Sequence, residues 1–581
     1  MRKIITLTIV LLATVAQAQI MMTFGDKFGN KRYAVADMDS IVYCHVNVPS
    51  AVTLMDRNGE YSIFAEALRR TGLCDSILNH LRDKSYYMDN PTDRDNNTLY
   101  YPKVCRLGYT VFAEKDEVLR AAGINSFADL AAKCSEWYGN PTWYDYVKEK
   151  GVSISTGTDY ENRWNVVNMF VAYHILKAKV AVDKLVYEKT KTNSSIWNVS
   201  FGYEPQSYYE TMLPGTLLKV WATDIDDTHL NPDLWVNRYV KNNTLTDQYG
   251  TFGSDAMHPV IYSGAKIDRG GSLEALNSWV HSIDNVLLYD QNARDSQHER
   301  IRMTQNQLLP ELASNNIYGA TGSQISNLNQ GGDGNRVAFP QDYFGNLRCY
   351  SNNTILRYNT LGAWRACESS QLQGWNIADY AIRLPNIPTG KYELRIIYPP
   401  MSRGGEHDFY IGNSSDTLTM TKVSTLDATL NPYESPEAFG YVDIPIERYP
   451  EEEISNEEKY GIESDKVMRQ HGYMRAPASF SRGTYNIITS KLTVTPDDPF
   501  AACKRMTGGT SCRTESGDGT MMLRYIIGTV DMKQGEDYWL RIKISNRNSN
   551  VADKNIVWYF NFIELVPTDV ADNDTYMEDW Y

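Results

Sequence analysis

The spacing of apolar residues is helical in the first half of the chain and changes to alternation in the second half. Between residues 61 and 73, the apolar side chains of Tyr61, Phe64 and Leu68 recur at helical spacing. The same pattern predicts further helices over residues 115–122, 127–134 and 165–176. Strand-like runs lie between them, at residues 107–112, 216–221 and 279–288. Residues 49–290 are therefore predicted to form an α+β domain.

From about residue 346 onward, apolar and polar residues alternate. Tyr380, Ile382 and Leu384 alternate with polar neighbours, and the pattern recurs over residues 392–396, 538–544 and 556–566. A period of two indicates strands that bury one face. Many short strands separated by Gly and Pro turns are typical of a β-sandwich. We predict this fold for residues 346–567, with a layout that resembles jelly-roll modules found beside carbohydrate-active proteins.

The segments around these two domains have different patterns. Residues 19–48 predict a short N-terminal β unit. Residues 291–345 read as a connector, because Gly-rich loops follow a helix expected over residues 298–313 that is bent or ended near Pro310. Residues 568–581 predict a loose acidic tail. The fold class expected for the chain is thus multidomain, with α+β and all-β parts.

The first eighteen residues have the pattern of a secretory signal peptide of Gram-negative bacterial style. Arg2 and Lys3 precede an apolar run over residues 4–13, and Ala16-Gln17-Ala18 provides a small-x-small cleavage site. The run is too short to span a bilayer comfortably, and no second apolar stretch is long enough. We expect an exported protein without a transmembrane segment, located in the periplasm, at the cell surface or outside the cell. A retained amphipathic anchor is the alternative.

Length, charge and aromatic content restrict the function further. A chain of 581 residues is too long for one core. Its formal charge of -14 repels polyanions, so we expect no nucleic-acid partner. The chain contains 40 Tyr and 12 Trp, which suit strands and cores but also sugar-stacking surfaces. The aromatic candidates for ligand contact are Trp137, Trp143, Trp364 and Trp375, with core packing as the alternative for each.

The eight cysteines permit disulfides in an exported protein. Cys503 and Cys512 flank a Gly-rich loop and form the favoured pair, and Cys349 with Cys367 is the second. Two further cysteines, Cys74 and Cys134, lie in apolar helical contexts that favour buried free thiols. No pair has the C-x-x-C spacing of zinc or redox sites.

Four ordered fragments resemble the motifs of fasciclin-type domains. They are residues 110–119, residues 123–130, the Tyr-His element at residues 172–176 and the closing motif at residues 276–287. The resemblance implies adhesion at a cell surface, and it implies a structural role for Thr110, Phe112, Tyr173, His174, Asn277, His281 and Asp284. Ser278 stands where the family usually has Gly, and long inserts at about residues 82–104, 135–164 and 222–260 separate the motifs.

The chain lacks the G-x-S-x-G, H-E-x-x-H and P-loop motifs. His174 and His281 lie in apolar runs, which favours buried, hydrogen-bonded imidazoles over a catalytic base. The acidic stretches at residues 224–227 and 451–458 are most simply solvated loops, although the first could hold calcium. We therefore expect no metal, no cofactor and no enzymatic activity, and a binding or adhesion protein that contacts a glycan or a cell-surface protein. A glycan-degrading hydrolase and a structural subunit of a surface assembly are the alternatives.

Overall fold

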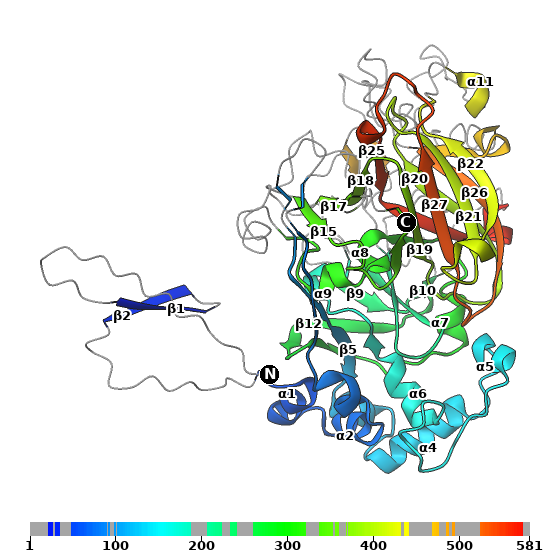
Figure 1. Ribbon diagram of the computed structural model, residues 1–581. Coiled ribbons are helices and arrows are strands. Elements are labelled where there is room, and N and C mark those ends of the chain that lie inside the picture. The colour runs from blue at the N-terminus through cyan, green and yellow to red at the C-terminus, as the bar shows by residue number, and fades with distance from the viewer. Residues whose placement is uncertain are drawn as a thin grey trace, which may run out of the picture. The chain divides into compact units, whose positions relative to one another are not determined.

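The structure is a computed structural model with two compact units, residues 1–48 and 49–581, each described here by itself (Figure 1). The described residues are 21–26, 29–34, 48–89, 91–92, 98–99, 101–186, 206–223, 233–240, 260–320, 336–351, 355–359, 368, 370–430, 435–440, 467–475, 484–486, 491–493 and 523–572. These residues form several β-sheets, and they contain more strands than helices. The predicted mixture of α+β and β-rich parts is confirmed at that level.

The smaller unit contains a β-hairpin. Strands β1 (Met21–Asp26) and β2 (Gly29–Ala34) pair antiparallel, with Met21 opposite Ala34 and Asp26 opposite Gly29. The hairpin lies within residues 19–48, where a short β unit is expected, and the proposed signal residues 1–18 lie outside the described part. The range 19–48 assigned to this β unit remains a prediction.

Three helices of residues 49–290, α1 (Ala51–Asn58), α4 (Phe127–Tyr138) and α6 (Val166–Tyr173), begin at a residue whose side chain caps the helix. Ser50 accepts a hydrogen bond from the Thr53 amide, Ser126 from Asp129 and Asn165 from Val167, so each caps a helix. The other helical segments are α2 (Ser62–Arg70), η2 (Cys74–Leu78), α3 (Asp116–Ala121), α5 (Asp145–Lys150) and η3 (Val182–Lys184), followed by α7 (Gln291–Asp295). Figure 1 shows α1, α2, α4 and α6 gathered at one end of the larger unit.

Within the described residues, a seven-stranded sheet packs with these helices. Its strand order is β6-β5-β13-β12-β9-β8-β7. The bounds are β5 (Tyr109–Glu114), β6 (Ile175–Leu176), β7 (Gln206–Glu210), β8 (Leu217–Thr223), β9 (Asp233–Val236), β12 (Ala265–Glu274) and β13 (Ser278–Ile283). The β5–β13 pair is parallel, with Val111 opposite Val280, and the other pairs are antiparallel. Two-stranded sheets β3 (Arg82–Ser85) with β4 (Val104–Leu107) and β10 (Tyr239–Val240) with β11 (Val260–Tyr262) accompany it.

The helix predicted over residues 165–176 ends earlier than its apolar run. Helix α6 stops at Tyr173, His174 caps it, and Ile175–Leu176 form β6. Leu176 pairs with Thr110 of β5, so strand pairing takes over the end of the run. The apolar pattern does not distinguish a buried helix end from a short buried strand.

The prediction of a helix that starts at residue 298 is wrong, because a strand occupies the first part of the range 298–313, but the break expected near Pro310 is present between two short helices. This segment contains β14 (Ile301–Thr304), α8 (Gln305–Leu308) and α9 (Glu311–Ser314). Strand β14 pairs antiparallel with β29 (Phe562–Pro567), which lies near the end of the described residues, and Ile301 is opposite Leu565. Thr304 forms a capping box with Gln307 and starts the new helix. The segment expected as a connector thus supplies a strand to a sheet of the β-rich region.

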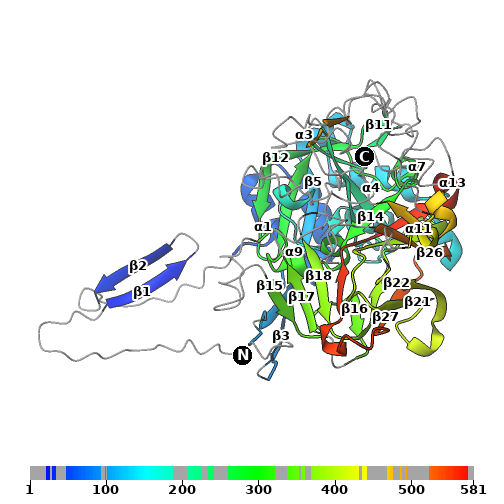
Figure 2. The same ribbon diagram turned by 90° about the horizontal axis from the view of Figure 1, so that it is seen from above.

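Most of the described strands of the β-rich region, residues 346–567, belong to three larger sheets. Two strands that precede the region, β14 and β15 (Arg336–Phe339), also pair in these sheets. The strand orders of the sheets are β14-β29-β20-β26-β23, β15-β17-β18-β28 and β16-β19-β27-β21-β22. The other bounds are β16 (Leu347–Cys349), β17 (Ile355–Asn359), β18 (Gln371–Trp375), β19 (Ala378–Arg383), β20 (Gly390–Tyr398), β21 (Glu406–Gly412), β22 (Thr421–Asp427), β23 (Tyr473–Arg475), β26 (Leu523–Met532), β27 (Trp539–Ser545) and β28 (Val557–Phe560). Figure 2 shows β27, β21 and β22 as neighbouring strands.

Smaller elements complete this region: β24 (Thr484–Asn486) pairs with β25 (Lys491–Thr493), and η7 (Thr417–Thr419), α11 (Pro436–Phe439), η13 (Asp553–Asn555) and α13 (Thr568–Ala571) are short helices. Helix α13 occupies the start of the expected tail. The predicted alternation is confirmed in β27, where Leu540, Ile542 and Ile544 are buried and Lys543 and Ser545 are exposed. It is not confirmed in β19, where Ala381 is buried between Tyr380 and Ile382.

The apolar side chains of residues 49–290 and of the β-rich region form one continuous core. Polar contacts also join them. Gln534, on the turn between β26 and β27, donates to the carbonyl of Gly215 at 2.8 Å and to the hydroxyl of Tyr289 at 2.7 Å. Both predicted ranges are therefore regions of one compact unit, and the boundary between them remains a prediction. A search of the described helices finds none that is both long and apolar enough to cross a bilayer.

Candidate functional site

Three of the four fragments that resemble fasciclin motifs supply strands β6, β5 and β13, which lie side by side at one edge of the seven-stranded sheet. Thr110 and Phe112 lie on β5 and are fully buried. The Thr110 hydroxyl donates to the carbonyl of Ala178 at 2.7 Å and accepts from the amide of Val180 at 2.9 Å. Thr110 therefore ties β5 to the chain that follows β6.

His174 caps α6 and connects that helix to the end of β5. Its Nδ1 lies 2.7 Å from the carbonyl oxygen of Phe170, and its Nε2 lies 2.9 Å from Oε1 of Glu114. A carbonyl oxygen only accepts, so Nδ1 donates to Phe170, and the other ring nitrogen forms its hydrogen bond with Glu114. Glu114 Oε1 also accepts from the amide of Leu287 at 2.9 Å. Both side chains are fully buried, which makes this pair a link between three segments.

His281 lies on β13, is fully buried, and contacts a serine. Its Nε2 donates to the carbonyl of Val180 at 3.0 Å, so in the neutral ring Nδ1 accepts from the Ser272 hydroxyl at 2.9 Å. Burial lowers the pKa of His281 to about 4, although the hydrogen bond to Val180 acts in the opposite direction. A serine beside an imidazole is the pairing that nucleophilic catalysis requires. A base with this pKa is far from its best strength at neutral pH.

The other motif residues also form contacts within the fold. The Tyr173 hydroxyl donates to the carbonyl of Leu217 at 3.1 Å. Asn277 donates to the carbonyls of Ile77 and His80, both at 2.7 Å. Asp284 is exposed after the end of β13, and its carboxylate accepts from the amide of Lys266 at 2.7 Å.

Two of the described aromatic candidates, Trp137 and Trp143, pack against the core. Trp137 is half-buried and stacks on Phe170, with ring centroids 5.9 Å apart. Trp143 is half-buried, and its indole NH donates to the carbonyl of Tyr289 at 3.1 Å. Trp375 is half-buried at the end of β18, and Trp364 lies outside the described residues. Packing therefore accounts for the described contacts of Trp137 and Trp143.

Cys349 has no disulfide partner among the described cysteines, and burial raises the pKa of its thiol to about 12. Its expected partner Cys367 lies outside the described residues, as do Cys503 and Cys512, so both pairings remain predictions. Cys74 and Cys134 are buried free thiols, as their apolar surroundings indicate.

The acidic stretches at residues 224–227 and 451–458 lie outside the part of the chain that the structure describes. Among the described residues, no group of three or more His, Cys, Asp or Glu side chains is arranged to hold a metal ion.

A cavity of about 310 Å³ lies where the seven-stranded sheet meets the β-rich region; we call it the junction cavity. Its lining is mostly apolar and includes Leu107, Tyr109, Ala178, Tyr209, Met212, Met303, Leu308, Pro310 and Pro385. Five polar residues also line it: Lys177, Glu210, Gln307, Asn346 and Arg383. A mostly apolar cavity with a few convergent polar groups is the usual form of a small-molecule site.

An ion-pair cluster forms the polar side of the junction cavity. Arg383 Nη2 lies 2.5 Å from Glu210 Oε2, and Lys177 Nζ lies 3.6 Å from the same oxygen. Burial acts to raise the pKa of Glu210, but Arg383 and Lys177 outweigh it and hold this pKa at about 2. The carboxylate is therefore ionised at every physiological pH.

No pattern in the sequence predicts this cluster. Glu210 and Arg383 are 173 positions apart in the chain, and neither belongs to a recognisable motif. Lys177 follows the Tyr-His element directly, which is the only cue that it lies near the motif residues. None of the motif residues that the resemblance marked lines the junction cavity.

Comparison with known proteins gives no further assignment: no family model matches the chain, and no curated protein matches it.

Proposed function

We propose that this chain is an exported, non-enzymatic adhesion or binding protein that contacts a glycan or a cell-surface protein. In this proposal, residues 49–290 are a fasciclin-like domain and residues 346–567 a jelly-roll-like β-sandwich. Binding would arise from shape, apolar contact and hydrogen bonds, without a bond being broken.

Three of the fragments that carry the resemblance contribute adjacent strands. Strand β5 lies between β6 and β13 in the sheet, so the fragments around residues 110, 175 and 280 meet there. The remaining fragment, residues 123–130, leads into α4, which packs against α6. This arrangement supports treating the four fragments as one structural unit.

The observation that carries the proposal is that both imidazole rings, of His174 and His281, are buried and hydrogen-bonded within the fold. His174 bridges Phe170 and Glu114, and His281 bridges Val180 and Ser272, with neither ring exposed. Groups of this kind are the usual bases of hydrolytic enzymes. Here their hydrogen bonds hold the sheet and helix together, which favours a scaffold that presents surfaces for contact.

The test uses the mature chain, residues 19–581, on a glycan array and in a pull-down from cell-surface extracts. We expect capture of a glycan or surface protein with the ligand recovered intact. Release of sugar or peptide fragments would contradict the proposal, and loss of that activity in Ser272→Ala would assign it to the Ser272–His281 pair. Ser62→Ala is the matched control, because the Ser62 hydroxyl also forms a side-chain hydrogen bond, to Asp116. Unchanged activity in this variant would show that the loss in Ser272→Ala is not a general effect of removing a serine.

One observation favours the structural-subunit alternative. The hairpin β3–β4 and its flanks expose apolar side chains: Leu81 is 46% exposed, Tyr87 83%, Val104 42% and Leu107 42%. Exposed apolar residues on a two-stranded sheet are typical of surfaces that pair with another chain. Light scattering at increasing concentration tests this function, and Val104→Lys is expected to shift any oligomer toward monomer.

A further inference from the structure

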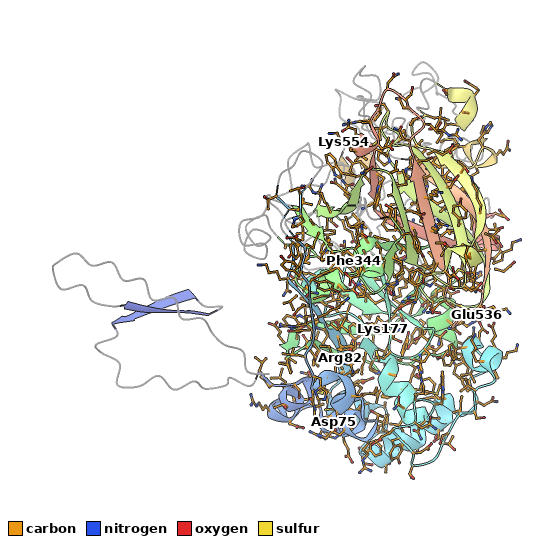
Figure 3. The ribbon with its side chains drawn as sticks, in the orientation of Figure 1. Asp75, Arg82, Lys177, Phe344, Glu536 and Lys554 are labelled. Atoms are coloured by element: carbon orange, nitrogen blue, oxygen red, sulfur yellow. The ribbon has the colours of Figure 1, made fainter. Side chains whose placement is uncertain are left out.

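The junction cavity has an apolar interior and a charged entrance. Met303, Leu308 and Tyr209 are at most 4% exposed and form its inner wall. Leu107 and the side chain of Lys177 are each 42% exposed and mark the solvent side. Figure 3 shows Lys177 near the middle of the larger unit, between the helices and the β-rich strands. The volume of 310 Å³ corresponds to about ten water molecules at roughly 30 Å³ each.

Most polar groups of the cavity already have protein partners. Arg383 donates through Nη2 to Glu210 and through Nε to Oδ1 of Asn346 at 3.0 Å. Asn346 in turn donates to the carbonyl of Leu308 at 2.9 Å. Gln307 accepts from the Thr304 amide at 2.8 Å. These bonds fix the polar side chains in place and reduce their capacity for a ligand.

Lys177 differs from the other polar groups. Its ammonium lies 3.6 Å from Glu210 Oε2, which exceeds hydrogen-bond length. An ammonium has three donors, and the exposed position leaves them accessible. Glu210 is shared with Arg383 at the shorter distance of 2.5 Å, so its charge is compensated mainly by the guanidinium. Lys177 is thus the polar group best placed to meet an anion at the entrance.

We propose that the junction cavity binds a small ligand that carries one carboxylate on an apolar body, with the carboxylate on Lys177 and the apolar part against Met303 and Leu308. This inference rests on the proposed binding function and names a ligand class for one site. A pyranose fits poorly, because its many hydroxyls would face an apolar wall and would lose their hydrogen bonds to water. Glycans contacted by the protein would then use a different surface.

The experiment is calorimetric titration of the mature chain with octanoate, with 1-octanol as the neutral analogue and glucose as the sugar. Octanoate is expected to bind about tenfold more tightly than octanol, because a charge-assisted hydrogen bond adds to the same apolar burial. Lys177→Gln is expected to remove that difference and to leave octanol binding unchanged. The matched control Lys133→Gln removes an exposed lysine of α4, which pairs with Glu136, and is expected to leave both affinities unchanged.

The carboxylate could come from a free fatty acid or from the end of an apolar peptide, and N-acetyl-leucine distinguishes these sources. Tighter binding by octanoate would indicate a fatty acid, and tighter binding by N-acetyl-leucine a peptide terminus. Equal affinity for octanoate and octanol, full octanoate affinity in Lys177→Gln, or no binding of either acid would overturn the inference. Failure of the proposed function would appear separately, as no capture in the glycan and pull-down assays.

Discussion

Acid is expected to destabilise this protein through His281. The ring is fully buried among β12, β13 and the segment after β6, and its pKa is lowered to about 4. In the unfolded chain a histidine has a pKa of about 6.5. Between these values the unfolded state binds a proton that the folded state excludes, so the free energy of unfolding falls as pH drops from about 6.5 toward 4. Above pH 6.5 the stabilisation is fully present.

The magnitude follows from the size of this pKa difference. One proton taken up on unfolding gives a slope of about 1.4 kcal/mol per pH unit, so roughly 2.5 units correspond to about 3 kcal/mol. His407 of β21 adds a parallel effect, since burial lowers its pKa to about 4 as well. Glu210 does not contribute to the fall in stability over most of this pH range. Its pKa in the folded state is about 2, so the stabilisation from its ionised form is lost only below about pH 4.5.

The assay is urea unfolding followed by tryptophan fluorescence at pH values from 7.5 to 5.0. His281→Gln is expected to be less stable at pH 7.5, because it disturbs two buried hydrogen bonds, but to lose stability less steeply as the pH falls. His80→Gln, at an exposed position, is the matched control and should keep the wild-type slope. A wild-type stability that does not change over this range would refute the reasoning, and so would an undiminished slope in His281→Gln.

Three other substitutions test the packing. Glu210→Gln leaves the half-buried Arg383 without its carboxylate and should lower the free energy of unfolding by about 3 kcal/mol, measured with urea at pH 7. A variant as stable as the wild type would show that solvent screens the ion pair. Gly374→Ala should destabilise by more than about 2 kcal/mol in the same assay, because the new Cβ would lie 1.7 Å from the Trp558 ring. A urea midpoint like that of the wild type would contradict this packing. Ser126→Ala should cost about 1 kcal/mol by removing the cap of α4, and Ser126→Asp should restore it.

Elements that bury one face could be predicted from the sequence. Helices α2, α3 and α4 carry apolar residues at helical spacing, and Gly123 follows α3 in the left-handed conformation that ends it. The alternating run at residues 538–544 became β27 for the corresponding reason. In these segments the local pattern and the tertiary environment favour the same structure.

The pattern failed where polar side chains are buried by distant partners. Gln305, Asn306 and Gln307 look like an exposed helical surface, yet all three are buried. Asn306 and Gln307 donate to Glu368, more than sixty positions away in the chain. Such satisfaction of buried polar groups depends on the complete fold, which a local window does not contain.

One part of the candidate site could be predicted from the sequence and another part could not. Burial of His174 and His281 could be inferred from their apolar neighbours in the sequence. The junction cavity could not, because its charged side chains Lys177, Glu210 and Arg383 come from three distant segments. Only the packing of the seven-stranded sheet against the β-rich region brings them together.

The pairing of β14 with β29 has a consequence for the order in which the chain matures. Strand β14 is synthesised near the midpoint, but its partner is among the last strands to emerge. The growing chain therefore carries an unfilled sheet edge until almost all of it has been made, and such edges invite aggregation. A chaperone that shields residues 301–304 during that interval would protect the nascent molecule where it is most vulnerable.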